Sequence, residues 1–326
     1  MKQYKKIQVV SLGSAVTGGP EALHHLVFEL NSLGIQSEII YYPFDQDFSV
    51  PDQYTDFCEQ PGHLEDKLGN LVIFPEILPN EALKIRNADA AIWWLSVDNF
   101  LVSKRINSWV DKIHYYQKAI RGQRPWGGYS ALKNLIHFSQ SSYASEFLQA
   151  AKLDLIEIFE PINSRFLNNS HVLLDVQMKR NEIIYNPIKR FDITSALIKS
   201  FPEIVFTPLK GFTRDELCTK LATSKAYIDF GHHPGRDRLP REAAMHGCCI
   251  ITGRLGAAKN SVDISIPPQY KLDHKDSRFL QDFKVLIDDI FVNTQKHIDS
   301  FQTYRFNIME EPRVFNKTLA KLFQKS

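Results

Sequence analysis

Residues 226–252 read AYIDFGHHPGRDRLPREAAMHGCCIIT, and they decide the fold class of this chain. The stretch opens on an apolar strand, 226–230, and passes through a polar loop that contains two glycines. Pro240 then opens a short helix, because its fixed φ suits the first helical turn, and Gly247 closes that helix. A second apolar strand follows at 248–252. Strand, helix and strand in this order form a β-α-β unit, whose strands run parallel in one sheet.

The same alternation continues on both sides of this stretch. The second half of the chain adds expected strands at 182–185 and 204–207, helices at 193–200 and 213–223, and a largely helical stretch, 282–325, interrupted around Pro312. The first half adds strands at 7–12, 37–42, 71–74, 90–95 and 135–138, with a glycine-containing loop, 13–19, and a helix, 20–33, after the first strand. This repeated alternation predicts a doubly wound parallel sheet in each half.

The length predicts the domain organisation. At about 150 residues per domain, a chain of 326 residues suggests two domains. We expect an N-terminal Rossmann-like domain over 1–178 and a C-terminal one over 179–304, with helix 305–326 as a candidate to pack back on the first domain. Ligands of such sheets bind at the carboxyl ends of the strands. We therefore expect the two α/β domains to face each other across a cleft that holds the ligand.

The composition excludes several classes of protein. Hydrophobic residues make up 44% of the chain, too many for a disordered protein, and a formal net charge of +2 argues against a dedicated nucleic-acid binder. The four cysteines show no spacing typical of a disulfide scaffold or a zinc site. No apolar run approaches the roughly 20 residues that span a bilayer. We expect a reduced, cytoplasmic protein.

The loop after strand 226–230 gathers basic and polar side chains at the carboxyl end of that strand. They are His232, His233, Arg236, Asp237, Arg238 and Arg241. Guanidinium groups and the backbone N–H groups of a helix start suit an anion, in particular a diphosphate. Glu242 lies in the first turn of the helix, where its carboxylate can accept hydrogen bonds from two neighbouring hydroxyl groups, such as those of a ribose. The alternative for each side chain is an ordinary solvated or helix-start residue.

This stretch resembles the donor-nucleotide motif of the GT-B glycosyltransferases, in particular the group 1 (family four-like) retaining transferases. The resemblance rests on Leu239-Pro240-Arg241-Glu242-Ala243 and Gly247, followed by a buried strand. It implies the GT-B fold, a nucleotide-sugar donor, and a Glu242 carboxylate that binds the donor ribose beside Leu239 and Pro240.

The motif departs from the family at one position. The family's first glutamate falls on Pro234 here, which removes the carboxylate that would contact the donor sugar. His232, His233 or Asp237 would take over that contact, and the two histidines are our candidates for catalytic groups. Asp98, which follows strand 90–95, is a candidate acceptor-side base.

Further segments complete the expected donor site by resemblance. Gly18 and Gly19 are similar to the family's N-terminal glycine loop, which closes over the donor. Asn186 and Lys189 lie where related transferases place a basic pair against the diphosphate, and Lys210 follows the next strand. Such cations stabilise a leaving nucleoside diphosphate. GT-B enzymes usually lack a metal ion, so the resemblance implies no metal and no cofactor besides the nucleotide-sugar co-substrate.

Basic residues are concentrated in one segment of the first domain. Residues 103–133 hold seven Lys and Arg against one acidic residue. Ile106, Trp109 and Ile113 share one face of the expected helix, so Trp109 is interpreted as a core residue. The basic residues lie mainly on the other face. This segment is either a solvated helix face with a surface loop, or a surface that docks on an anionic membrane or a lipid-diphosphate acceptor.

Together these features predict a glycosyltransferase that moves a sugar from a nucleotide-diphosphate sugar to a glycan or lipid-linked acceptor. By resemblance, the setting is bacterial surface polysaccharide synthesis, on the cytoplasmic side of the membrane. A non-catalytic GT-B module that binds a nucleotide or glycan stays open, as does a sugar-nucleotide epimerase. A Rossmann oxidoreductase would need G-x-G-x-x-G after its first strand, which residues 13–18 do not supply.

Overall fold

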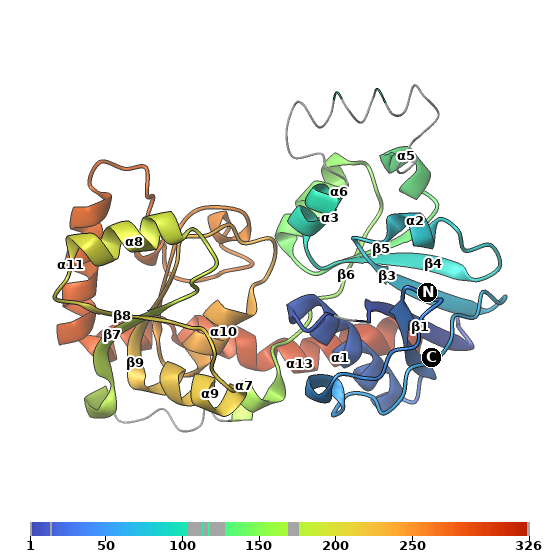
Figure 1. The fold of residues 1–326 in the computed structure, drawn as a ribbon, viewed down its shortest axis with the longest axis horizontal. Helices are drawn as coiled ribbons and strands as arrows, with labels where there is room; N and C mark the ends of the chain where they lie inside the picture. The colour runs from blue at the N-terminus through green and yellow to red at the C-terminus, as the bar shows by residue number, and fades with distance from the viewer. Residues whose placement is uncertain are drawn as a thin grey trace. The chain divides into compact units, whose positions relative to one another are not determined.

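The structure is a computed structural model that describes residues 2–13, 15–103, 113, 117, 128–168 and 176–324. The chain divides into two compact units. The first unit consists of Met1–Glu160 and Pro312–Ser326, and the second of Pro161–Glu311. Each unit is an α/β domain built around a parallel sheet of its own, as Figure 1 shows. The fold class expected from the sequence is confirmed.

The sheet of the first unit has six strands in the order β2-β1-β3-β4-β5-β6. Their bounds are β1 (Lys6–Leu12), β2 (Ser37–Tyr42), β3 (Asn70–Pro75), β4 (Asp89–Trp94), β5 (Ile136–Ser139) and β6 (Ile156–Glu157). Every neighbouring pair runs parallel. The five expected strands are all present. β6 was not expected, since two residues are too few to carry a periodic pattern.

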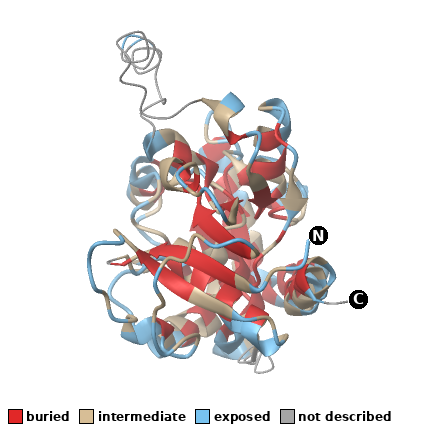
Figure 2. Ribbon diagram, turned by 90° about the vertical axis from the view of Figure 1, so that its right-hand side faces the viewer, coloured by how far each residue is buried: buried red, intermediate tan, exposed pale blue. Residues whose placement is uncertain are grey.

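Helices cover both faces of this sheet. β3 is buried along its whole length. Its residues Leu71 and Ile73 belong to one apolar cluster with α1 (Gly18–Ser32). Val72 and Phe74 belong to another cluster, which contains residues of α3 (Val97–Ser103) and α6 (Ser142–Ala150). Two-sided burial is the condition under which a parallel sheet is stable, and Figure 2 shows buried residues concentrated in the strands. The short elements are η1 (Asp52–Tyr54), α2 (Pro79–Ala82) and α5 (Tyr129–Leu132).

The sheet of the second unit has four parallel strands in the order β10-β9-β7-β8. Their bounds are β7 (Arg180–Tyr185), β8 (Val205–Pro208), β9 (Ser224–Asp229) and β10 (Cys249–Thr252). The helices are α7 (Ser164–Asn168), α8 (Phe191–Ser200), α9 (Arg214–Thr223), α10 (Arg238–Met245), α11 (Phe279–Val292) and α12 (Thr294–Ser300), with 3-10 turns η3 (Val176–Met178), η4 (Ala257–Lys259) and η5 (Pro268–Tyr270). α10 starts at Arg238, two residues before the proline expected to open it.

The last helix, α13 (Gln302–Phe323), contributes to both units. Tyr304 and Ile308 belong to the core of the second unit, whereas Phe315 and Leu319 belong to the core of the first. The expected interruption around Pro312 was wrong, because the helix continues through this residue. Packing of both halves into apolar cores offsets the backbone hydrogen bond that a proline removes. The sequence analysis placed the domain boundaries at 178/179 and 304/305. In the structure, the chain passes from the first unit to the second at 160/161 and returns to the first unit at 311/312.

Candidate functional site

The strand order of the second sheet reverses between β7 and β9. The chain leaves β7 for β8 on one side and then returns to form β9 on the other side. In open parallel sheets, ligands bind outside the carboxyl ends of the strands at such a switch point. The loop 186–190 follows β7, and the loop 230–237 follows β9. These two segments, both singled out from the sequence, thus arise from the ends of adjacent strands.

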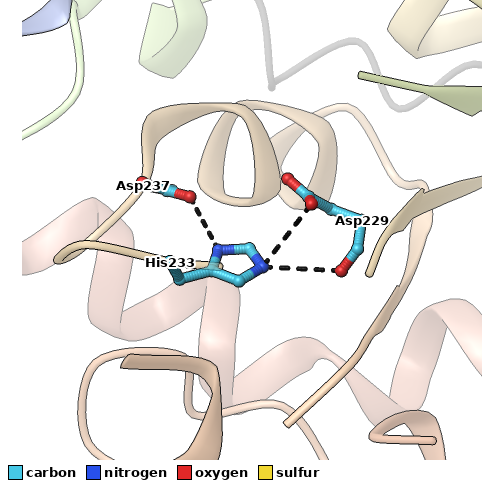
Figure 3. A group of neighbouring side chains, drawn as sticks. All are labelled: Asp229, His233 and Asp237. Carbon is cyan, nitrogen blue, oxygen red and sulfur yellow. Dashed lines mark hydrogen bonds and ion pairs between the residues drawn. The ribbon is translucent and has the colours of Figure 1, made fainter. Parts of the chain in front are cut away.

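Charged and titratable side chains meet at this switch point. Asp229 ends β9, His233 follows it in the loop, and Asp237 precedes α10. His233 Nδ1 lies 2.7 Å from Asp237 Oδ2, and His233 Nε2 lies 3.8 Å from Asp229 Oδ1, so that the imidazole lies between two carboxylates (Figure 3). The Lys189 ammonium comes from the loop after β7. It contacts Asp237 Oδ2 and lies 3.8 Å from Asp229 Oδ2.

Two glycines allow this close arrangement. A Cβ atom on Gly231 would lie 2.5 Å from Lys189 Cβ, so only glycine lets the lysine stem cross this loop. Gly256 has a φ of +62°, and a Cβ atom there would lie 2.2 Å from the His233 carbonyl oxygen. The loops after β9 and β10 therefore approach each other backbone to backbone, and this approach fixes the position of His233.

The charges around Asp237 keep its carboxyl group ionised. Burial by itself would raise the pKa of Asp237, but the neighbouring His233 and Lys189 outweigh that effect and lower the pKa to about 2. Asp229 is fixed differently: the Tyr227 hydroxyl donates to its Oδ2 at 3.1 Å, and the Gly231 N–H donates to its Oδ1 at 2.9 Å. The result is one ammonium group facing two carboxylates.

Glu242, the predicted ribose ligand, lies in α10 and is only 6% exposed. Leu239 and Pro240 precede it in the first turn of the same helix. Asp237 occupies the N-cap position, yet its side chain makes no capping hydrogen bond. The third helical residue is Pro240, which has no N–H to offer such a cap.

The arginines of the motif have internal partners. Arg241 is fully buried, and its Nη1 donates to Glu311 Oε2 at 2.6 Å. Its Nη2 donates to the Arg236 carbonyl oxygen at 2.8 Å. Arg236 also contacts the Glu311 carboxylate. The structure thus turns these two guanidinium groups toward one carboxylate of α13, whereas Arg238 lies in the first turn of α10 and is partly exposed. Their contact with phosphate stays a prediction.

The other predicted residues of this unit lie around the same strand ends. His232 is exposed, unlike the buried His233. Asn186 follows β7 directly, and its Oδ1 accepts a hydrogen bond from the Ile188 N–H at 3.0 Å, which shapes the loop that carries Lys189. Lys210 follows β8 and is exposed. The structure therefore brings Asn186, Lys189 and His233 to adjacent strand ends, with Lys210 one strand further along.

Among the described residues, one group has the composition of a metal site. Ligand atoms of Asp229, His233 and Asp237 lie within 4.8 Å of one another. The Lys189 ammonium already contacts this carboxylate pair and balances part of its charge. An incoming cation would have to displace that ammonium. Asp45 and Asp47 also form an Asp-x-Asp pair after β2, and both are exposed.

The predicted residues of the first unit lie at the carboxyl edge of its sheet. Gly18 and Gly19 open α1, directly after the loop that leaves β1. The strand order of this sheet reverses between β1 and β3, so α1 starts at the switch point. Asp98 lies in the first turn of α3, after β4, and the Tyr143 hydroxyl lies 3.4 Å from its Oδ1. A groove of about 500 Å³ lies at the opposite edge, and its lining includes Ala82, Asp89, Asn134 and Ile136.

The sequence reasoning missed Glu76, which directly follows β3 at the switch point of the first sheet. The carboxylate is 3% exposed, and its Oε2 accepts a hydrogen bond from the Leu95 N–H at 3.1 Å. Burial raises the pKa of Glu76 to about 7, although backbone N–H groups favour its ionised form. An acidic residue next to the apolar run 71–75 was the available signal.

The basic segment 103–133 falls mostly on residues outside the described ones. The membrane contact expected through this segment therefore concerns residues that lie mostly outside the described part of the chain. Among the described helices, none combines the length and apolar character needed to cross a membrane.

No family model matches the sequence, and no curated protein matches it either. Solved structures of glycosyltransferases, however, resemble this structure along nearly the whole chain. HepE from Anabaena, solved with UDP-glucose, has 10% sequence identity and a TM-score of 0.62, over 97% of this chain and 98% of that chain. Sucrose-phosphate synthase from Thermosynechococcus elongatus has 10% identity and a TM-score of 0.68, over 98% of each chain.

A third similar structure is the pneumococcal O-GlcNAc transferase GtfA, solved with UDP and GlcNAc. It has 10% identity and a TM-score of 0.57, over 98% of each chain. Similarity at such low identity concerns the course of the backbone. With its two parallel-sheet units, this chain has the GT-B fold that its sequence resemblance implied.

Proposed function

We propose that this protein is a glycosyltransferase that uses a nucleoside-diphosphate sugar as donor. One observation carries the proposal. Within a GT-B fold, the switch point of the second sheet joins Lys189 to the start of α10, the helix that holds Glu242. A cation beside the N-terminus of a helix favours a diphosphate, and a carboxylate one turn further along suits the ribose hydroxyl groups.

Each candidate residue has a role in this proposal. Glu242 holds the ribose beside Leu239 and Pro240. Lys189 neutralises the diphosphate, with contributions from Asn186, Lys210, Arg236, Arg238 and Arg241. Gly18 and Gly19 contact the donor, Asp98 acts as a base on the acceptor, and His232 and His233 replace the glutamate that is missing at Pro234. Positive charge at the leaving nucleoside diphosphate stabilises the transition state of glycosyl transfer.

The proposal also covers the acceptor, the cellular location and the absence of a metal ion, as the sequence predicted them. The acceptor is a glycan or a lipid-linked sugar, in bacterial surface polysaccharide synthesis. The enzyme works in the cytoplasm without a metal ion, because Lys189 supplies the charge that a metal would bring. Segment 103–133 makes a peripheral contact with anionic lipid. Liposome flotation with and without anionic lipid tests this contact, and the absence of salt-sensitive binding would contradict it.

Calorimetric titration of UDP, ADP and GDP into the purified protein tests the donor site. At least one nucleotide is expected to bind, and Glu242→Gln is expected to weaken that binding about ten-fold, or about 1.4 kcal/mol. Glu203→Gln is the matched control, since Glu203 is an exposed carboxylate of the same unit. Absence of binding by all three nucleotides, or equal affinity of wild type and Glu242→Gln, would refute the proposal.

Turnover separates the remaining functions. A transferase releases nucleoside diphosphate from a nucleotide sugar when an acceptor, or slowly water, is present. An epimerase converts the nucleotide sugar without an acceptor. A non-catalytic module binds but does neither, and the loss of a motif glutamate at Pro234 is the observation that favours it.

A further inference from the structure

We propose that the Asp237 carboxylate occupies, in the free protein, the place that a donor phosphate takes on Lys189, so that donor binding exchanges one anion for the other. This inference rests on the proposed function and deepens it. Asp237 becomes a residue that sets donor affinity, as an internal competitor for the Lys189 ammonium.

The two carboxylates that face Lys189 differ in how firmly they are held. The side chain of Asp229 is 1% exposed, and its oxygens accept hydrogen bonds from the Tyr227 hydroxyl and the Gly231 N–H. The side chain of Asp237 is 18% exposed and contacts Lys189 and His233. Asp229 is therefore a fixed counter-charge, whereas Asp237 is the carboxylate that can leave.

The start of α10 explains why Asp237 points toward Lys189. An aspartate at the N-cap normally accepts a hydrogen bond from the N–H of the second or third helical residue. Pro240 is the third helical residue and has no N–H, and Asp237 makes no capping hydrogen bond. Its carboxylate can therefore contact Lys189 on the other side of the switch point. This contact lies at the N-terminal end of α10, where a phosphate is expected to bind.

The charges around Lys189 favour replacement of the Asp237 carboxylate by a phosphate over binding of the phosphate beside it. The Asp237 carboxylate lies where a phosphate oxygen would contact Lys189, and two anions in such close contact repel each other. When Asp237 leaves, Asp229 still holds Lys189 at 3.8 Å, and His233 Nδ1 faces the incoming oxygen in place of Asp237. Because the pKa of Asp237 is about 2, protonation does not release Lys189 at any ordinary assay pH.

The test is a double-mutant cycle on nucleotide affinity, measured by calorimetry with UDP, ADP and GDP as probes. Asp237→Asn keeps the shape of the side chain and removes its charge. It is expected to tighten binding of the cognate nucleotide about ten-fold. Lys189→Met is expected to weaken nucleotide binding. The double variant is expected to bind no more tightly than Lys189→Met, because without the ammonium group Asp237 no longer competes with the phosphate.

Asp192→Asn is the matched control. It removes a carboxylate that pairs with Arg190 at 2.8 Å, three residues from Lys189 in the sequence, and is expected to leave affinity unchanged. Thermal unfolding of each variant checks that it is folded. Equal or weaker binding by Asp237→Asn, with wild type binding normally, would overturn this inference alone. If neither wild type nor Asp237→Asn binds any probe, the proposed function fails and this inference fails with it.

Discussion

Arg241 and Glu311 form an ion pair in the interior of the second unit, with Arg241 Nη1 2.6 Å from Glu311 Oε2. Arg241 is fully buried and Glu311 is 6% exposed. Arg236 contacts the other oxygen of the same carboxylate. A motif arginine that the sequence assigns to phosphate binding thus also joins α10 to α13, and this contact has consequences for stability.

Glu311→Ala is expected to lower the free energy of unfolding by about 3 kcal/mol, because it leaves the Arg241 charge buried without its carboxylate. Urea unfolding measures the loss. Asp288→Ala removes an exposed carboxylate that pairs with Lys284 and is expected to change stability by about 0.5 kcal/mol or less. Equal effects of the two substitutions would show that the buried pair contributes no more than a surface pair.

The Lys179 ammonium is held by three backbone carbonyl groups, Ala222 at 2.7 Å, His246 at 2.9 Å and Ser224 at 3.1 Å. Lys179→Met is expected to lower the free energy of unfolding by about 3 kcal/mol. The buried carbonyl groups then lack a donor, and the C-terminal ends of α9 and α10 lose a neighbouring positive charge. Lys225 donates to one carbonyl, that of Phe291, so Lys225→Met should cost about 1 kcal/mol. Thermal unfolding compares the two variants, and an equal loss would argue against this account.

Gly231→Ala is expected to displace Lys189, because the new Cβ atom would lie 2.5 Å from Lys189 Cβ. The crowding should cost about 1–3 kcal/mol of stability and weaken nucleotide binding. Gly253→Ala is the control, because the nearest atom to its Cβ would be the Phe230 carbonyl oxygen at 3.4 Å, an ordinary contact. Calorimetry measures the nucleotide affinity, and thermal unfolding measures the stability. Unchanged nucleotide affinity in folded Gly231→Ala would contradict the expected displacement of Lys189.

Glu76 is expected to make the protein less stable as the pH rises. Burial raises the folded-state pKa of Glu76 from 4.5 to about 7, so the folded state holds the proton more tightly than the unfolded state. The stabilisation that the protonated Glu76 side chain gives to the folded state is fully present below pH 4.5 and is lost as the pH rises through about 7.

Glu76→Gln, which carries no titrating proton, should therefore gain up to about 3 kcal/mol relative to wild type between pH 4.5 and pH 8. Urea unfolding of both proteins at these two pH values measures the gain. Glu59→Gln, which alters an exposed carboxylate of the same unit, should show no such pH-dependent difference. A difference between wild type and Glu76→Gln that is independent of pH would contradict the raised pKa.

Strand positions were predictable because parallel strands buried on both faces are short apolar runs, as in 71–74 and 226–229. The capping box of α9, Thr213 with Glu216, is local chemistry and is also legible in the sequence. The course of α13 was not predictable at Pro312, since a local rule favours a break there, and packing in both cores overrides it.

The site was predictable in part. Lys189 and the loop 230–237 were candidates because each follows an expected strand. Their meeting at one switch point depends on the strand order, which no short sequence window contains. Glu76 was not predictable, because a single acidic residue after a strand is common and only its burial in the folded chain distinguishes it.

By itself, the sequence determined the α/β class and the doubly wound pattern in each half, because hydrophobic period, turn residues and helix starts are local properties. It also showed the stretch around Glu242 that resembles a donor-nucleotide motif. Only the tertiary structure decided the partners of the charged side chains: Arg241 with Glu311, and Lys189 with Asp237. Ion pairs between residues 48 and 70 positions apart depend on strand order and helix packing, which arise when the whole chain buries its apolar surface.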